Sequence, residues 1–214
     1  MSDLYNEGTT TTSTDNTEPV YVEEATKDNE KWFQEFREFD YGIDINSNVI
    51  LIQDEVAMGL LFDVVSKVRL LRKINPELKS VTLLLNSPGG DVVETLGLID
   101  YMRTLKENDG IVTNIVCRGS AMSAAALLLA AGTGLRAASK HSKIMVHQLS
   151  SFTAGKLSDI KSNAKFAEQL EDDCNTIMEE CTKKDKTWWE ENQQNDYFLS
   201  AEDALELGII DKII

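Results

Sequence analysis

The chain has 214 residues, of which 42% are hydrophobic and 27% are charged, a composition typical of one globular domain with a sizeable core. Its formal net charge of −15 argues against nucleic acid and anionic membrane surfaces as partners, because both require clustered lysine and arginine. The longest apolar block, residues 124–131, is too short to span a bilayer.

The first residues of the chain are predicted to be a disordered, acidic and threonine-rich tail over residues 1–29. Residues 1–40 hold 11 acids against 3 bases, and the run 9–14 contains only threonine and serine, so little apolar surface is available for folding. Aromatic residues then recur at spacings of three and four over 30–39, which predicts a short amphipathic helix. That helix would pack on the domain itself or on a neighbouring subunit.

From residue 48 onward the pattern alternates between strands and helices. Apolar runs predict strands at 48–52, 81–85, 111–117 and 143–148, and three-and-four spacing predicts helices at 57–71 and from 92 to about 105. A further helix, rich in alanine and leucine, follows Ser123. This alternation predicts right-handed crossovers and a mainly parallel sheet, hence an α/β fold.

A long amphipathic helix is predicted at about 157–183. Its apolar residues keep a three-and-four spacing opposite a polar back, so the helix would cover the domain or project to meet another copy. Trp188 and Trp189 are expected to pack against the end of this helix. The three cysteines form no CxxC pair, and with no visible secretory signal they indicate reduced thiols in a cytoplasmic protein.

The serine at the start of the alanine-leucine helix points to a hydrolase. Ser123 follows an apolar strand, so its hydroxyl can stand clear of the backbone where an oxyanion would be stabilised. A serine hydroxyl needs an adjacent base at neutral pH, and the chain has two histidines. His147 ends a predicted strand and would lie at the sheet edge, whereas His141 lies in a polar turn.

The segment 86–91, with sequence NSPGGD, is a candidate oxyanion loop. Its paired glycines let the backbone approach a ligand and leave N–H groups free, although such a loop is about as often a plain tight turn. A phosphate-binding loop is disfavoured because the lysine and hydroxyl residue that should follow the glycines are absent. Asp91 is expected to cap the next helix. No metal site or cofactor is expected.

Four motifs then occur in one order along residues 40–214. They are 86–90, 119–132, 144–148 and 196–201, the last followed by Ala204, Gly208 and Asp211. Together they resemble the proteolytic subunits of the Clp protease, the ClpP-like serine peptidases. The resemblance implies one peptidase domain over 30–214. Its fold would be the repeated strand-strand-helix superhelix of ClpP and crotonase, with a projecting handle helix.

The resemblance also assigns roles to individual residues. Ser123 would be the nucleophile, His147 the general base and then acid, and Asp196 the carboxylate that orients His147. The backbone N–H groups of Gly90 and Ala124 would form the oxyanion hole. The expected substrates are polypeptides, cleaved inside a homo-oligomeric chamber of one heptameric ring or two stacked rings. An ATP-driven AAA+ unfoldase would be the partner.

Three departures and two alternatives stay open at this stage. Segment 149–152 replaces the proline and glycines that the family usually has, and Gln194 and Asn195 replace charged residues that pair across its ring interface. The first 30 residues do not resemble the loops that engage the unfoldase. One alternative is a crotonase-type acyl-CoA enzyme, which uses a Gly-Gly oxyanion loop. The other is a structural ring subunit without activity.

Overall fold

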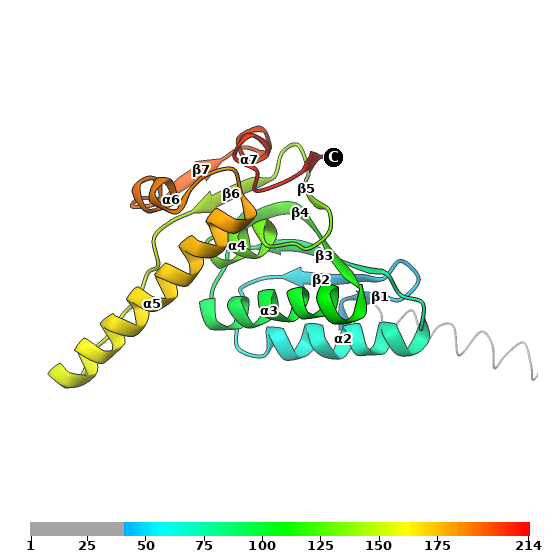
Figure 1. Cartoon of the computed structure of the whole chain (residues 1–214), viewed down its shortest axis with the longest axis horizontal. Coiled ribbons are helices and arrows are strands. Elements are labelled where there is room, and N and C mark those ends of the chain that lie inside the picture. Colours follow the sequence, from blue (N-terminus) through cyan, green and yellow to red (C-terminus); the bar gives the residue numbers. More distant parts are fainter. Residues whose placement is uncertain (1–40) are drawn as a thin grey trace, which may run out of the picture.

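The computed structural model describes residues 41–214 of the chain (Figure 1). The predicted tail at 1–29 and the predicted aromatic helix at 30–39 lie outside the described residues. The strands are β1 Ile43–Asp44, β2 Val49–Gln53, β3 Ser80–Ser87, β4 Val112–Met122, β5 Arg136–Ala138, β6 Lys143–Val146, β7 Tyr197–Leu199 and β8 Lys212–Ile213. The helices are α2 Leu60–Ile74, α3 Val92–Asp109, α4 Ala124–Ala130, α5 Leu157–Cys181, α6 Lys186–Asn192 and α7 Ala201–Leu207.

These strands form one sheet, and the prediction of a mainly parallel sheet is confirmed. The order is β1-β2-β3-β4-β5-β8, and β6 pairs with β4 on one side and β7 on the other. Neighbours from β2 to β8 along this path are parallel, as are β4 and β6. Only the β1–β2 and β6–β7 pairings are antiparallel within the described part of the chain.

Strand β4 runs five residues beyond its predicted end at Cys117. Its first part pairs with β5 through Cys117, and its last part, Ser120–Met122, pairs with β6. Gly119 lies between the two parts with φ +105°, a conformation that other residues rarely adopt. A Cβ there would lie 3.0 Å from the Asn86 side-chain carbon Cγ. The glycine therefore lets one strand change neighbours, which the apolar pattern alone did not indicate.

Helices α2, α3 and α4 pack successively beside one another, and α4 also contacts β3, β4 and β6 (Figure 1). The predicted stripe on α2 holds at Val64, Val68 and Leu71, but Ala57 is exposed and precedes the helix. On α3, Ile99, Met102 and Leu105 are buried as predicted. At its start Val92 and Leu96 are only half-buried, and Thr95 and Leu98 are buried as well. The α3 N-terminus borders an open groove, so its first turn has fewer neighbours.

Helix α5 projects from the body of the domain (Figure 1). Its buried residues, Asn175, Ile177 and Met178, all lie in its C-terminal half, whereas Leu157 and Phe166 in the other half are exposed. The end of the helix is packed by α6, as predicted. Trp189 is fully buried there, and its Nε1–H donates to Thr182 Oγ1 at 2.9 Å.

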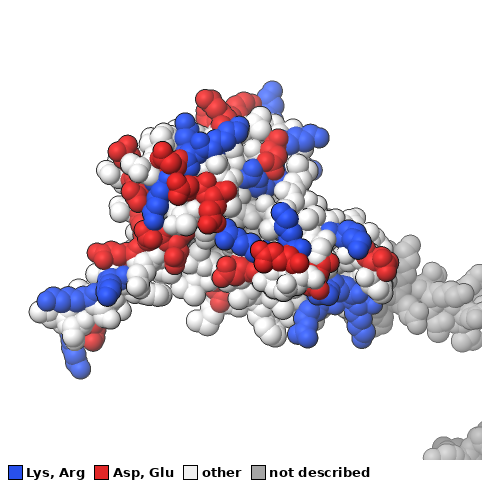
Figure 2. Space-filling model, in the orientation of Figure 1, with Lys and Arg blue, Asp and Glu red and all other residues white. Residues whose placement is uncertain are grey.

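Acidic and basic side chains are interspersed on the face shown in Figure 2, over helices that face solvent. None of the helices in the described residues combines the length and apolar composition needed to cross a membrane.

Candidate active site

Ser123 lies at the sharp turn between β4 and α4. Its φ of 53° and ψ of −126° are outside the regions favoured by L-residues, and such strain is concentrated at functional sites. The backbone N–H of Ser123 donates to Met145 O at 2.8 Å, which fixes the turn against β6. The side chain makes no capping hydrogen bond to α4. The hydroxyl is therefore presented away from the helix it precedes.

His147 is brought to Ser123 by the parallel pairing of β4 and β6. In this pairing Met122 lies opposite Met145, so Ser123 and His147 follow the same ends of neighbouring strands. The His147 Nε2 atom lies 2.7 Å from Ser123 Oγ, a hydrogen-bond distance, and the imidazole is 24% exposed. His141 is exposed in the turn before β6, as the sequence predicted.

Asp196 is brought to the other ring nitrogen by β7. Strands β6 and β7 are antiparallel with Val146 opposite Tyr197, so the next residues outward are His147 and Asp196. Asp196 Oδ1 lies 3.4 Å from His147 Nδ1. This distance is longer than the 2.7–3.2 Å typical of a hydrogen bond, and the carboxylate is 58% exposed.

The glycine pair lies directly against the serine turn. A Cβ on Gly89 would come within 2.8 Å of Ser123 Cβ and 3.0 Å of Ala124 N, so only glycine fits there. The loop is fixed by two hydrogen bonds of 2.7 Å, from Val56 N–H to Gly89 O and from Asp91 N–H to Val56 O. The N–H groups of Gly90 and Ala124 donate to no acceptor among the residues that the structure describes.

Asp91 caps α3, as the sequence predicted, by accepting a hydrogen bond from Glu94 N–H at 3.0 Å. Ser87 Oγ accepts from Gly89 N–H at 3.1 Å and is buried, so the loop is held from inside. These contacts make the NSPGGD segment a rigid wall beside Ser123.

One small pocket is lined by Ser123, and a larger groove lies close to it. The small pocket of about 50 Å³ lies beside Ser123 and is lined mainly by apolar side chains, including Leu127, Val146 and Met178. The groove of about 340 Å³ runs between Gly90 at the start of α3 and the segment Leu149–Thr153. The groove therefore lies beside the glycine loop, and it shares Val92 and Leu149 with the small pocket that Ser123 lines.

Cys174 of α5 also lines the small pocket. Burial, with a smaller contribution from Glu171 and Asp173, raises the pKa of its thiol to about 12. The thiol is therefore protonated at neutral pH and is not a nucleophile there. Over residues 41–214 no group of histidine, cysteine and acidic side chains is arranged to hold a metal ion.

Comparison with known proteins shows the family of the chain. The model of the Clp protease family matches residues 34–214. The chain belongs to the Clp protease family. It is a serine-type peptidase, and the resemblance drawn from its motifs is confirmed.

Three named relatives of the Clp protease family show how far the similarity extends. The ATP-dependent Clp protease proteolytic subunit 1 of Chlamydia felis is 34% identical over 171 residues, which is 79% of this chain and 82% of that protein. The subunit 1 of Prochlorococcus marinus is 34% identical over 180 residues, 83% of this chain and 90% of its own length. The subunit 2 of Chlamydia abortus is 34% identical over 171 residues, covering 79% and 81%.

The five residues singled out from the sequence, Ser123, His147, Asp196, Gly90 and Ala124, all border one end of the sheet in this Clp protease family member. The sequence did not single out three polar residues behind them, Glu171, Asn175 and Gln193, which hydrogen-bond to the segments next to His147 and Asp196 or to each other. The spacing of four between Glu171 and Asn175 indicates that they share a helix face, but it does not indicate which residues they bond.

Proposed function

We propose that the protein cleaves peptide bonds of polypeptides through an acyl-enzyme formed on Ser123. The 2.7 Å contact between Ser123 Oγ and His147 Nε2 carries this proposal, because it joins a hydroxyl to the base it needs. His147 takes the hydroxyl proton as Oγ attacks the carbonyl carbon, and then gives that proton to the leaving amine. His147 then takes a proton from water as the water attacks the acyl ester, and it returns that proton to Ser123 Oγ as the carboxylic acid product leaves.

Asp196 would hold the imidazole with Nδ1 protonated and stabilise the imidazolium that forms. The oxyanion of each tetrahedral intermediate would be bound by the N–H groups of Gly90 and Ala124, which have no acceptor among residues 41–214, and each donor would contribute about 10²- to 10³-fold to the rate. Because these are main-chain donors, the methyl side chain of Ala124 does not weaken them.

The same contact favours a peptidase over a crotonase-type acyl-CoA enzyme. Both classes would use the Gly89–Gly90 loop, but a crotonase mechanism gives no role to a serine in contact with a histidine. A structural ring subunit without activity is disfavoured for a related reason. Ser123, His147 and Asp196 are all present and lie together.

A fluorophosphonate probe tests the proposal. The full-length protein is expected to be labelled at Ser123, and Ser123→Ala is expected to lose both labelling and peptide cleavage while keeping its fold. Ser120→Ala is the matched control, since Ser120 lies on the same strand but its Oγ contacts Asn86 Oδ1 at 3.2 Å. Normal peptide cleavage by folded Ser123→Ala would contradict the nucleophile assignment.

We further propose that the protein assembles into a homo-oligomeric ring, heptameric and single or stacked in pairs, with α5 as its handle. The exposed apolar side chains of Leu157 and Phe166 on the projecting half of α5 support a contact with another copy. The relatives are named ATP-dependent, which supports an AAA+ unfoldase as partner. Native mass measurement should give seven or fourteen copies, and a stable monomer would contradict the proposed ring.

A further inference from the structure

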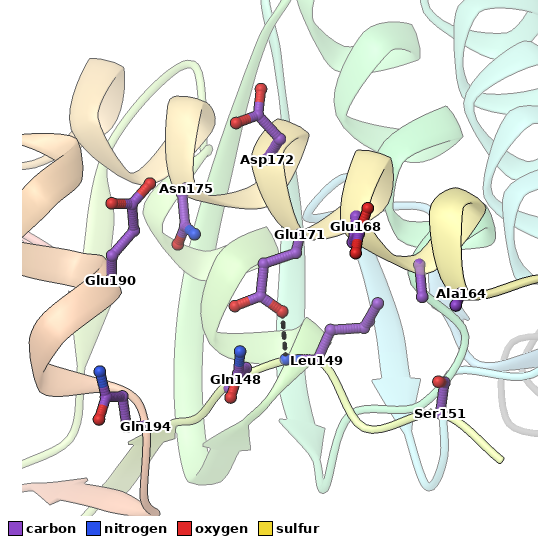
Figure 3. A pocket seen from close by; sticks show the side chains of 11 residues that line it. Gln148, Leu149, Ser151, Ala164, Glu168, Glu171, Asp172, Asn175, Glu190 and Gln194 are labelled. Atoms are coloured by element: carbon purple, nitrogen blue, oxygen red, sulfur yellow. Dashed lines mark hydrogen bonds between the residues drawn. The ribbon is translucent and has the colours of Figure 1, made fainter. Parts of the chain in front are cut away.

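Helix α5 is hydrogen-bonded to the chain segment that follows His147. Glu171 Oε2 accepts a hydrogen bond from the backbone N–H of Leu149 at 2.8 Å (Figure 3). Glu171 is half-buried, and Leu149 lies only two residues beyond His147. The position of the main chain next to the imidazole therefore depends on a side chain of α5.

The same helix is bonded to the segment that precedes Asp196. Asn175, one turn after Glu171 and on the same side of α5, accepts a hydrogen bond through Oδ1 from Gln193 Nε2 (Figure 3 shows Asn175 and Glu171). Asn175 is 2% exposed and Gln193 is 7% exposed. The two segments are also joined to each other, because Gln148 N–H donates to Gln193 O at 2.6 Å.

These contacts begin where the strand ladder stops. The β6–β7 pairing ends at Val146 and Tyr197, so His147 and Asp196 lie just beyond the last paired residues of these two strands. Their side chains are 3.4 Å apart and partly exposed. Beyond them the next restraints are the Gln148–Gln193 and Leu149–Glu171 bonds. His147 thus lies between the last residue pair of β6 and β7 and the hydrogen bonds that come from α5.

We infer that Glu171 is a positioning residue that holds the main chain after His147, and with it the imidazole, at reacting distance from Ser123. The inference rests on the proposed roles of Ser123 and His147. A misplacement of a reacting group by about 1 Å can cost about 10²-fold in rate. A hydrogen bond that fixes the main chain two residues after His147 can therefore affect the rate of catalysis.

The acceptor oxygen of Glu171, rather than its charge, is what this role requires. Glu171, Glu168, Asp172 and Glu190 all line one groove of about 800 Å³ (Figure 3). Among these four acids, Glu171 alone accepts a main-chain hydrogen bond, and Asp172 is paired with Lys186 at 2.5 Å. The Glu168 side chain is exposed and makes no hydrogen bond within the described residues. A test can therefore separate loss of the acceptor from loss of a negative charge.

The test compares Glu171→Leu and Glu171→Gln in the full-length protein, with Glu168→Leu and Glu168→Gln as matched controls one turn earlier on α5. Glu171→Leu removes the acceptor and is expected to lower kcat about 10- to 100-fold, with KM within about threefold of wild type. The rate of fluorophosphonate labelling should fall in parallel. Glu171→Gln keeps an amide oxygen and should stay within about threefold of wild type, as should both Glu168 variants. Thermal midpoints measure folding, and Glu171→Met replaces the leucine variant if that variant does not fold.

Wild-type kcat in folded Glu171→Leu would overturn the inference, as would a rise in KM at constant kcat. A Glu171→Gln variant as slow as Glu171→Leu would also overturn it, since charge would then be the property that matters. Failure of the probe to label Ser123 in the wild-type protein would instead overturn the proposed function. Normal wild-type labelling with unchanged labelling of Glu171→Leu would overturn only the role of Glu171.

Discussion

Replacing Gly89 by alanine should damage the site more than the fold. Gly89 has φ +95°, and a Cβ added there would lie 2.8 Å from Ser123 Cβ and 3.0 Å from Ala124 N. Gly59 offers a matched control, because its φ is +101° and a Cβ there would meet nothing within 4 Å. Both substitutions impose a backbone conformation that alanine disfavours, but only the alanine at position 89 collides with Ser123, the proposed nucleophile.

The contacts at Gly89 give the expected difference in stability and activity between Gly89→Ala and Gly59→Ala. An alanine at either position should cost about 1–2 kcal/mol of folding free energy for its backbone conformation. At Gly89 the overlap adds about 1–3 kcal/mol, as in other overpacked sites. An ordinary contact needs at least 3.4 Å, so Ser123 Cβ must move from 2.8 Å by about 0.6 Å or the loop must withdraw. A shift of that order is expected to lower kcat/KM by about 10- to 100-fold.

Peptide cleavage, fluorophosphonate labelling and urea unfolding of the two variants would provide the comparison. Gly59→Ala should be destabilised yet react with the probe at the wild-type rate. Gly89→Ala should be folded under the assay conditions and react slowly. Equal labelling rates in the two variants would contradict the expectation that the Gly89 loop fixes the position of Ser123.

Three further predictions concern stability and the pocket thiol. The Arg136 guanidinium lowers the pKa of Asp211, so this pair stabilises the fold above the unfolded-state pKa of about 3.9 and loses its contribution as pH falls through the lower folded value. Asp211→Asn should therefore reduce the thermal midpoint at pH 7 but match wild type well below the folded pKa, and an equal deficit at both pH values would contradict this. Thr182→Val removes the acceptor of the buried Trp189 Nε1–H and should cost about 1–3 kcal/mol in urea unfolding, whereas Thr182→Ser should not. Cys174, with a pKa raised to about 12 by burial, should resist iodoacetamide at pH 8 until the protein is denatured, and stoichiometric alkylation of the native protein detected by mass spectrometry would show the opposite.

The longer elements could be predicted from the sequence because each carries its own signal. Apolar runs gave β2, β3, β4 and β6 within a few residues, and three-and-four spacing gave α5 as Leu157–Cys181 where 157–183 was expected. The two- and three-residue strands β1, β5, β7 and β8 carry no such period. They are formed by tertiary pairing, with β1, β7 and β8 at edges of the sheet and β5 between β4 and β8, and a local pattern does not encode such pairing.

The candidate site divides in the same way. Ser123 and His147 were accessible from the sequence, since each directly follows an apolar strand, and the carboxyl ends of parallel strands meet at one edge of a sheet. Asp196 is one of 36 acids and precedes a strand of only three residues, so its choice rested on the family resemblance.

What places Asp196 is the direction and register of β7. In an antiparallel pair the start of one strand meets the end of the other, so β7 begins where β6 ends and Asp196 comes opposite His147. A slip of one residue in this pairing would put Tyr197 or Asn195 opposite the imidazole and reverse which side chains face the core. Two residues at the far end of β7 oppose such a slip. Leu199 is buried and would have to leave the core, and Ser200 would have to give up its place as the N-cap of α7. The carboxylate is thus held in register by a core leucine and a helix cap, neither of which touches it.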